Sequence, residues 1–248
     1  MSISERQSQI LEILNERYYA GVTELAKLTY TSPSSIRRDL TTLQNQGLVQ
    51  RSHGGVTLPE PAVGVASLQD RMSQNVPQKR YIAKLAARYL TPGQTVLLDG
   101  SSTAGFLLPY IAKAGQIRLF TNNIVTALNA IELGIHTDLI GGHSVNGSAV
   151  LSGTMAYRIV SDLRPDILFF SSQSLDDDGV ISDSTEEENY LRSLMIRGAE
   201  RTVFLCDSSK FHKRSGYVLT DLSQIDHAVF DAPFPGWEND KFLRQPVL

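Results

Sequence analysis

Cysteine and long apolar runs are scarce in this chain of 248 residues. The single cysteine, Cys206, excludes an internal disulfide and suits a reducing compartment. It follows the apolar residues 203–205, which favours a buried strand residue over a catalytic thiol. The apolar runs are too short to span a bilayer, and the polar N-terminus lacks the apolar stretch of a secretory signal. We therefore expect a cytoplasmic protein.

Metal-ligand spacing and a strong charge of one sign are also absent. The five histidines are scattered along the chain, and the sequence predicts neither a metal nor another cofactor. The net charge is only −3. Residues 1–58 carry six Lys or Arg and five Asp or Glu, a net +1. Affinity for nucleic acid must therefore come from a few well-placed cations, or from doubling in an oligomer.

The most informative stretch that is present covers residues 32–47, which predict a capped helix with a cationic outer face. Ser32 fits the N-cap and Pro33 the first helical position. Apolar residues recur at i, i+4 and i+7 and form one stripe. The other side of the helix carries side chains that suit a DNA major groove: Ser34, Ser35, Arg37, Arg38 and Thr41. Taken alone, such a helix fits a solvated protein surface equally well.

The flanking segments complete a winged helix-turn-helix domain over residues 3–58. The helix-turn-helix itself covers about 20–46, behind an apolar-periodic helix over 6–17. Residues 48–56 then alternate apolar and polar around a Gly-Gly turn, as a small hairpin does.

Two polar residues on this hairpin, Arg51 and His53, are candidate phosphate contacts, which position a protein on DNA without reading bases. Asp39 has a different role. It lies only about 60° from the apolar stripe and would repel phosphate. We interpret it as an internal hydrogen-bond or ion-pair partner.

A linker over 59–77, rich in proline and glycine at its start, leads to a second domain at 78–248. There, apolar strand-like runs alternate with helical runs, which predicts an α/β domain with a mostly parallel sheet covered on both faces. The principal predicted strands are 95–98, 117–120, 137–140, 166–170, 202–206 and 227–230; the helices are 104–112, 124–133, 155–163 and 187–198.

Small and polar residues follow five of these strands, where ligands of parallel sheets bind. Each cluster alone is ordinary loop chemistry, but their coincidence predicts a pocket for a polyhydroxylated anion, with Lys210 as the point charge on a phosphate. The candidate effector-binding residues are Asp99, Gly100, Ser101, Ser102, Thr103, Thr121, Asn122, Gly141, Gly142, Ser171, Gln173, Asp207 and Lys210.

The run Ser-Ser-Ile-Arg-Arg-Asp-Leu at 34–40, followed by Gly-Leu-Val and Arg-Ser-His-Gly-Gly-Val, resembles the DeoR family of bacterial transcriptional regulators. The resemblance continues to about residue 231. It implies an effector domain similar to ribose-5-phosphate isomerase, whose site is lined by the strand-end motifs above. It adds Glu188 to the candidate site, with Arg192 where the family usually has lysine.

Members of this family mostly sense phosphorylated sugars or related intermediates and usually act as repressors. Two departures stand out. Ser35 replaces the usual threonine, which removes a methyl group that could touch thymine. Residues 171–174 are Ser-Ser-Gln-Ser where relatives have glycines, which either adds hydrogen bonds to a sugar or narrows the pocket.

The resemblance implies a homo-oligomeric repressor, a dimer or tetramer, that binds double-stranded operator DNA under control of a sugar phosphate. The alternative is a sugar-phosphate isomerase with an added domain, in which Glu188 or Asp207 is the base and Lys210 the phosphate anchor. The N-terminal domain favours the regulator, because an enzyme has no use for a helix shaped to read a DNA groove.

Overall fold

The computed structural model describes residues 4–17, 19–46, 48–52, 55–57, 68–234, 236 and 242–243. The chain divides into an N-terminal unit, Met1–Val65, and a C-terminal unit, Ala66–Leu248. None of the helices in the described ranges is long and apolar enough to cross a membrane.

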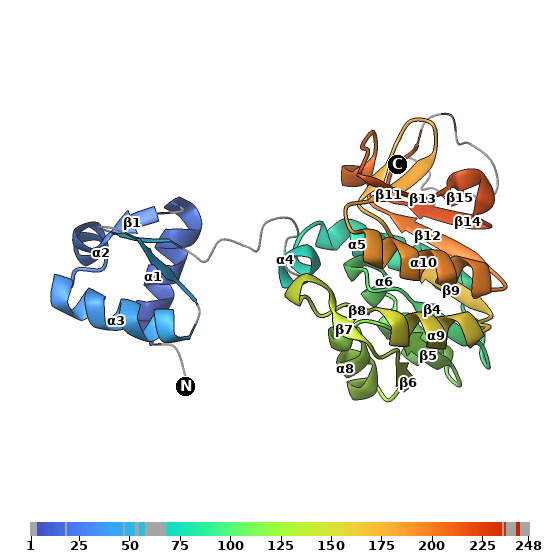
Figure 1. Ribbon diagram of the computed structural model, residues 1–248, viewed down its shortest axis with the longest axis horizontal. Helices are drawn as coiled ribbons and strands as arrows, with labels where there is room; N and C mark the ends of the chain where they lie inside the picture. The colour runs from blue at the N-terminus through green and yellow to red at the C-terminus, as the bar shows by residue number, and fades with distance from the viewer. Residues whose placement is uncertain are drawn as a thin grey trace. The chain divides into compact units, whose positions relative to one another are not determined.

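The described part of the N-terminal unit is a winged helix-turn-helix, drawn in blue in Figure 1, as the sequence predicts. Ser32 caps the third helix by accepting a hydrogen bond from the Ser35 amide at 3.3 Å, and Pro33 occupies the first turn. The apolar stripe of that helix is buried against Ile10 and Leu14. The helices are α1 (Glu5–Arg17), α2 (Val22–Leu28) and α3 (Pro33–Asn45); strands β1 (Tyr19–Gly21), β2 (Gln50–Ser52) and β3 (Gly55–Thr57) pair in the order β1-β3-β2.

Seven of the described strands of the C-terminal unit form a parallel sheet, which confirms the predicted fold class; β10, β11 and β13 form a separate antiparallel sheet, and β7 pairs with β8. The order of the strands is β15-β14-β12-β9-β4-β5-β6, so β4, β9 and β12 are neighbours near the centre. The strands are β4 (Thr95–Leu98), β5 (Arg118–Thr121), β6 (His136–Leu139), β9 (Ile167–Phe170), β12 (Thr202–Cys206), β14 (His227–Phe230) and β15 (Phe242–Leu243).

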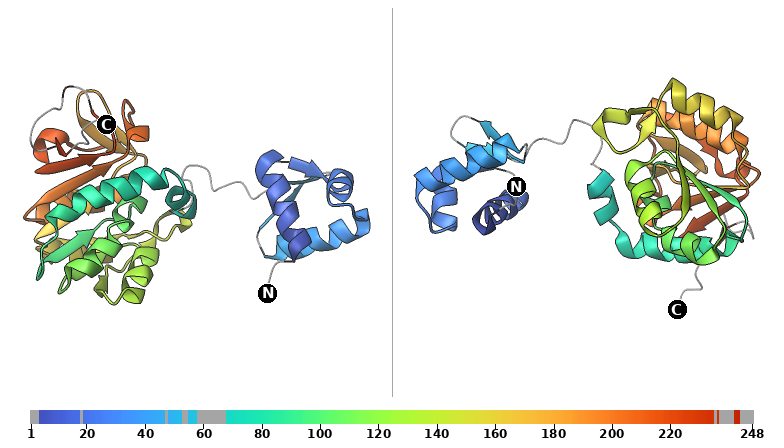
Figure 2. Two further views of the ribbon diagram at one scale, coloured as in Figure 1. Left: turned by 180° about the vertical axis from the view of Figure 1, so that it is seen from behind. Right: turned by 90° about the horizontal axis from the view of Figure 1, so that it is seen from below.

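Helices cover both faces of this sheet. α9 (Thr154–Asp162) and α10 (Glu186–Gly198) lie in front of it in Figure 1, and α5 (Val76–Ala86) lies in front in the opposite view at the left of Figure 2. Along β9, Leu168 and Phe170 belong to the first layer, and Ile167 and Phe169 to the second. Because both layers are apolar, the central strands read as continuous apolar runs.

Several short elements escape the sequence prediction. Pro109 lies in the first turn of a new helix, so the predicted helix 104–112 is two helices. Strands of two residues carry too few side chains to show a pattern, and β13 buries none of its five residues, so it lacks the apolar run of the central strands. These elements are α6 (Ser102–Gly105), α7 (Leu108–Ala114), β7 (His143–Ser144), β8 (Leu151–Ser152), β10 (Ser174–Leu175), β11 (Val180–Asp183) and β13 (Tyr217–Asp221). In contrast, α8 (Ile124–Glu132) matches the predicted helix 124–133.

The predicted boundary at residue 78 needs a correction. Helix α4 (Leu68–Ser73) belongs to the C-terminal unit, and α5 begins at Val76. Asn75 joins the two helices in a left-handed conformation with φ of 52°. Pro77 lies in the first turn of α5, where a missing N–H costs nothing, so this proline opens a helix instead of marking a linker.

Candidate DNA-binding helix and ligand cavity

The outer face of α3 presents the five side chains that the sequence predicted for DNA contact. Ser34, Arg37, Arg38 and Thr41 are exposed, and Ser35 is half-buried under the capping residue. Within the described residues, neither arginine side chain takes part in an ion pair. Helix α3 therefore presents two exposed guanidinium groups beside small hydroxyl side chains, a combination that suits phosphate and base edges.

Arg51 of β2 reaches back onto α3. Its Nη2 donates to the carbonyl oxygen of Arg37 at 2.7 Å and to the Thr41 hydroxyl at 3.1 Å. The wing is thereby tied to the outer face of the helix, and α3 sets the position of this guanidinium. Its remaining donors stay exposed for a phosphate. The other predicted wing contact, His53, lies outside the described residues.

The structure confirms the internal role predicted for Asp39. Its carboxylate accepts a hydrogen bond from Arg6 Nε at 2.6 Å and one from the Gln7 amide at 3.4 Å. The hydrogen bond and charge of Asp39 raise the pKa of Arg6. Asp39 therefore joins α3 to α1, and its charge does not weaken the cationic outer face.

A polar cavity of about 350 Å³ lies at the carboxyl ends of β4, β9 and β12. Its wall carries five cationic side chains against two carboxylates, together with hydroxyl and amide groups. The lining residues are Arg71, Gln74, Asn75, Lys79, Ser101, Ser102, Ser171, Ser172, Gln173, Ser174, Asp183, Arg192, Asp207, Ser209, Lys210 and Lys213. The cavity has the size, polarity and charge to hold a small polyhydroxylated anion.

The loop after β4 is shaped by hydrogen bonds of Asp99. One oxygen of this carboxylate accepts from the backbone N–H of Ser101 at 3.1 Å and from its hydroxyl at 2.5 Å. The Ser101 oxygen in turn accepts from the Ala104 amide at 3.2 Å and caps α6. Ser101 and Ser102 thus reach the cavity wall, and Asp99 serves behind them as a support.

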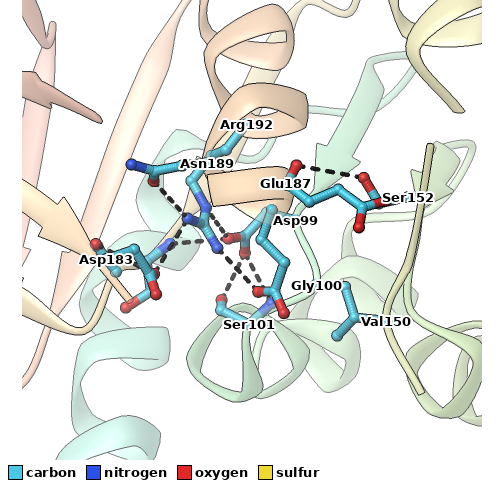
Figure 3. Close-up of polar contacts among 12 residues, drawn as sticks. Asp99, Gly100, Ser101, Val150, Ser152, Asp183, Glu187, Asn189 and Arg192 are labelled. Carbon is cyan, nitrogen blue, oxygen red and sulfur yellow. Dashed lines mark hydrogen bonds and ion pairs between the residues drawn. The ribbon is translucent and has the colours of Figure 1, made fainter. Parts of the chain in front are cut away.

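A buried ion cluster closes the back of the cavity (Figure 3). The guanidinium of Arg192, on α10, contacts Asp99 at 2.9 Å, Asp183 at 3.2 Å and Glu188 at 3.7 Å. Burial by itself would lower the pKa of Arg192, but the three carboxylates outweigh burial and hold that pKa above its ordinary value. Burial raises the pKa of Glu188. The cluster joins β4, β11 and α10 into one rigid wall.

Lys210 lies in the wall and is already paired. Its ammonium contacts Asp207 at 3.4 Å, donates to the Ser171 hydroxyl at 2.8 Å and lies 3.5 Å from the buried Thr103 hydroxyl. Burial opposes the ionisation of Asp207, but Lys210 and the Ser209 hydroxyl outweigh burial and lower its pKa. This pair supplies a fixed dipole as well as a cation.

The serines after β9 bind mainly to the protein. Ser171 donates to the Leu205 carbonyl at 2.6 Å, Ser172 to the Ser182 carbonyl at 2.5 Å, and Ser174 shares a hydrogen bond with Ser215. Since these hydroxyls bind to other groups of the protein, the serines at positions where relatives have glycines narrow and stiffen the cavity. Gln173 also lines the cavity.

Sequence reasoning missed the cations that α4 and α5 bring to the cavity. Lys79 is 3% exposed and donates from Nζ to the Ser102 hydroxyl at 3.1 Å and to the Arg71 carbonyl. Asn75 donates to Asp207 at 3.1 Å. One signal was available: Lys79 lies on the same face of α5 as buried apolar residues, which is an unusual place for a lysine without a partner.

The structure does not bring all of the predicted site residues to this cavity. Asp99, Gly100, Asn122 and Glu188 surround a separate space of about 10 Å³, the size of one water site. Thr103 also lies outside the cavity wall, with its hydroxyl 3.5 Å from the Lys210 ammonium. The other three predicted residues belong to β5 and β6, which lie beyond β4 on the side away from β9 and β12: Thr121 ends β5, and Gly141 and Gly142 follow β6.

Several of the predicted residues outside the cavity wall instead contact the segment Val150–Ser152, which stabilises the fold. The Asn122 amide donates to the Leu151 carbonyl at 2.8 Å. At Gly142, where φ is 154°, an added Cβ would lie 2.1 Å from the carbonyl oxygen of Ser152, so only glycine fits. At Gly100 it would lie 2.6 Å from a Val150 methyl group.

Comparison with known families accounts for nearly all of the chain. A DeoR-like helix-turn-helix domain matches residues 6–62, and the DeoR C terminal sensor domain matches residues 74–232. The chain therefore belongs to the DeoR family of transcriptional regulators, with an N-terminal DNA-binding domain and a C-terminal sensor domain.

Three relatives illustrate the range of the family. The putative aga operon transcriptional repressor of Escherichia coli O157:H7 is 31% identical, over 94% of this chain and 87% of its own. The L-fucose operon activator of Haemophilus influenzae is 32% identical, over 93% and 92%. The glycerol-3-phosphate regulon repressor of Escherichia coli K12 is 26% identical, over 95% and 93%.

Among solved structures, ribose 5-phosphate isomerase from Plasmodium falciparum overlaps with 54% of this chain and 52% of its own. The TM-score is 0.39 and the identity 19%. At that score the likeness says nothing about activity.

Proposed function

We propose that this protein represses a carbohydrate catabolic operon, and that a phosphorylated sugar or related intermediate in the cavity controls its affinity for operator DNA. The observation that carries the proposal is the cationic excess of a cavity otherwise lined by hydroxyl and amide groups. Cations select a phosphate, and the neutral polar groups suit a sugar or polyol. The printed names of relatives, which include an aga operon repressor and a glycerol-3-phosphate regulon repressor, support the same class.

On the DNA side, α3 enters the major groove, and its arginines and hydroxyls contact bases and phosphates. The N-terminal unit is nearly neutral overall, so the proposal includes a homo-oligomer, a dimer or tetramer, that brings two α3 helices to half-sites about 34–36 Å apart. The protein works in the cytoplasm, where operator DNA is accessible. By linkage, operator DNA must weaken effector binding by the same factor by which effector weakens DNA binding.

The cavity offers little to the alternative, a sugar-phosphate isomerase. Glu188 lies under Arg192 and outside the cavity wall, and Asp207 is paired with Lys210. Neither carboxylate is a free base at the place where a substrate would bind. Incubation with pentose and hexose phosphates should therefore yield no product, and measurable turnover would contradict the proposal.

Two measurements on the full chain test the proposal. In a thermal-shift screen of phosphorylated carbohydrates, the compound that binds should raise the melting temperature of the protein, because a ligand at 100 times its Kd stabilises the native state by about 2.7 kcal/mol. Footprinting upstream of the chain's own gene and its neighbours should reveal paired half-sites.

A variant of the cavity lysine tests the phosphate assignment. At a ligand concentration that saturates the wild type, Lys210→Ala should bind operator normally and lose the ligand response. A normal response in that variant would refute the phosphate assignment.

A further inference from the structure

One cation of the cavity wall, Arg71, has two side-chain nitrogen atoms that meet no hydrogen-bond acceptor among the described residues. Arg71 lies on α4, the first described helix after the segment that joins the two units. Its Nε and Nη2 atoms are buried and, in the described part of the chain, no hydrogen-bond acceptor meets either of them. Buried N–H groups of a guanidinium that lack an acceptor are costly, and a planar oxyanion is the group that fits them best.

The neighbouring cations are already engaged. Arg192 is neutralised by its carboxylates, and Lys210 is paired with Asp207. The Lys79 ammonium donates one hydrogen bond to the Ser102 hydroxyl and one to the backbone carbonyl of Arg71. Among the arginines and lysines of the described wall, only Arg71 has buried side-chain nitrogen atoms that lack an acceptor.

Like charges reinforce the need for an anion. Burial, together with the charges of Lys210 and Arg71, lowers the pKa of Lys79 to about 8. Asp207 opposes this shift and does not cancel it. A bound anion would relieve this repulsion for all three cations at once.

The position of α4 depends on this corner of the cavity. The helix has only six residues, too few to be stable without tertiary contacts. The Lys79 ammonium holds it by the carbonyl oxygen of Arg71, and its contacts include α6, which carries Ser102 at the cavity wall. A ligand held by the Arg71 side chain would fix the same residue from the other side.

We propose that Arg71 binds the anionic group of the effector and that, by fixing α4, it transmits occupancy of the cavity to the segment leading to the DNA-binding unit. This inference rests on the proposed function for the identity of the ligand, but the anion site rests on the two unpartnered nitrogen atoms of Arg71 alone. Arg71 is therefore both a binding residue and the coupling residue.

The test compares the wild type with Arg71→Gln, Arg71→Lys and a control, Arg158→Gln, which changes an exposed arginine of α9 outside the cavity. The probes are inorganic phosphate, ribose 5-phosphate, fructose 6-phosphate and glycerol 3-phosphate. Calorimetry and thermal shift measure binding to the full chain, and fluorescence anisotropy measures operator affinity with and without each probe. Unchanged operator affinity without probe shows that each variant is folded.

We expect Arg71→Gln to weaken binding of the active probe by about tenfold or more, as for loss of a charge-assisted hydrogen bond. Even when its concentration is raised until the cavity is full again, operator affinity should shift less than in the wild type. Arg71→Lys should keep part of the binding and little of the coupling, because an ammonium lacks the guanidinium fork. The control should match the wild type.

Three results would overturn the inference in whole or in part. Unchanged probe affinity in Arg71→Gln would remove Arg71 from the site. Weaker binding with a full operator response on resaturation would overturn the coupling role. A wild type that binds none of the probes would overturn both this inference and the proposed function. If the wild type binds inorganic phosphate through Arg71 but no sugar phosphate, the anion site holds and the proposed function fails.

Discussion

The two functional surfaces of this protein are built in opposite ways. The proposed DNA-binding surface lies mainly on one helix, α3, and so comes from one contiguous stretch of sequence. The cavity draws its wall from the ends of β4, β9 and β12 and from α4, α5 and α10, which are spread from Arg71 to Lys213. A surface on one helix is fixed by local periodicity, whereas a cavity between strand ends is fixed by strand order and long-range packing.

The same contrast recurs within the C-terminal unit. Polar clusters that follow the central strands line the cavity, and similar clusters that follow β5 and β6 serve the scaffold. Residue type alone does not separate the two groups. Their place in the sheet does, and the following predictions test that separation from the largest effect to the smallest.

The ion cluster behind the cavity should give the largest effect. Arg192→Met leaves the carboxylates of Asp99, Asp183 and Glu188 buried without their counter-charge, so we expect a loss of about 3–5 kcal/mol in the free energy of unfolding of the C-terminal unit. Urea unfolding followed by circular dichroism measures it. The exposed control Arg158→Gln should change stability by less than about 0.5 kcal/mol. Equal stability of the two variants would show that the cluster does not hold the cavity wall.

The DNA-binding helix should show a loss in binding without a loss in stability. Arg38→Ala removes an exposed guanidinium from α3, and we expect operator binding to weaken by about 1–3 kcal/mol. Fluorescence anisotropy at fixed salt measures the change. Arg88→Ala, which removes an exposed cation from the C-terminal unit, is the control. Unchanged operator binding by the Arg38 variant would mean that another face of the domain meets DNA.

The adjacent glycines after β6 offer a matched pair. Gly142→Ala places a Cβ against the carbonyl of Ser152 and should destabilise the unit by about 1–3 kcal/mol. Gly141→Ala meets nothing within 4 Å and should change stability by less than about 0.5 kcal/mol. Neither change should alter probe affinity, measured by calorimetry on the folded protein. Selective loss of probe binding in either variant would return these glycines to the ligand site.

The smallest effect concerns pH. The pKa of Lys79 is lowered to about 8 in the folded protein, chiefly by burial. At a pH between about 8 and the ordinary pKa of lysine, Lys79 binds more protons in the unfolded chain than in the folded protein. The contribution of Lys79 to the stability of the ligand-free protein therefore increases as pH rises. Anion binding has the opposite dependence, because the ammonium is lost above pH 8. From about pH 7 to about pH 9.5, probe affinity should fall by about two- to fivefold, the size of one screened charge interaction.

Lys79→Met should remove most of that pH dependence. The described wall contains no histidine, and a phosphate monoester, whose second pKa is about 6, is already mostly doubly ionised at pH 7. An affinity that stays constant in the wild type would exclude Lys79 from the anion site.

Much of this protein could be read from its sequence. Ser32, Pro33 and the apolar stripe of α3 fixed the DNA-binding helix, because caps and periodicity act over one or two turns. The family resemblance and the continuous apolar strands identified the parallel sheet and its ligand edge. The internal role of Asp39 also followed from its place on the helix wheel.

Only the tertiary structure decided which polar clusters meet. Strand order lies in no local pattern, so Thr121 and Gly141 looked as suitable for the cavity as Ser101 and Ser171. Tertiary packing also decided that part of the predicted linker forms α4 and that Lys79 is buried in the cavity wall. Local sequence sets which residues can form a helix or strand, but contacts between distant residues depend on how those elements pack, and the cavity consists of such contacts.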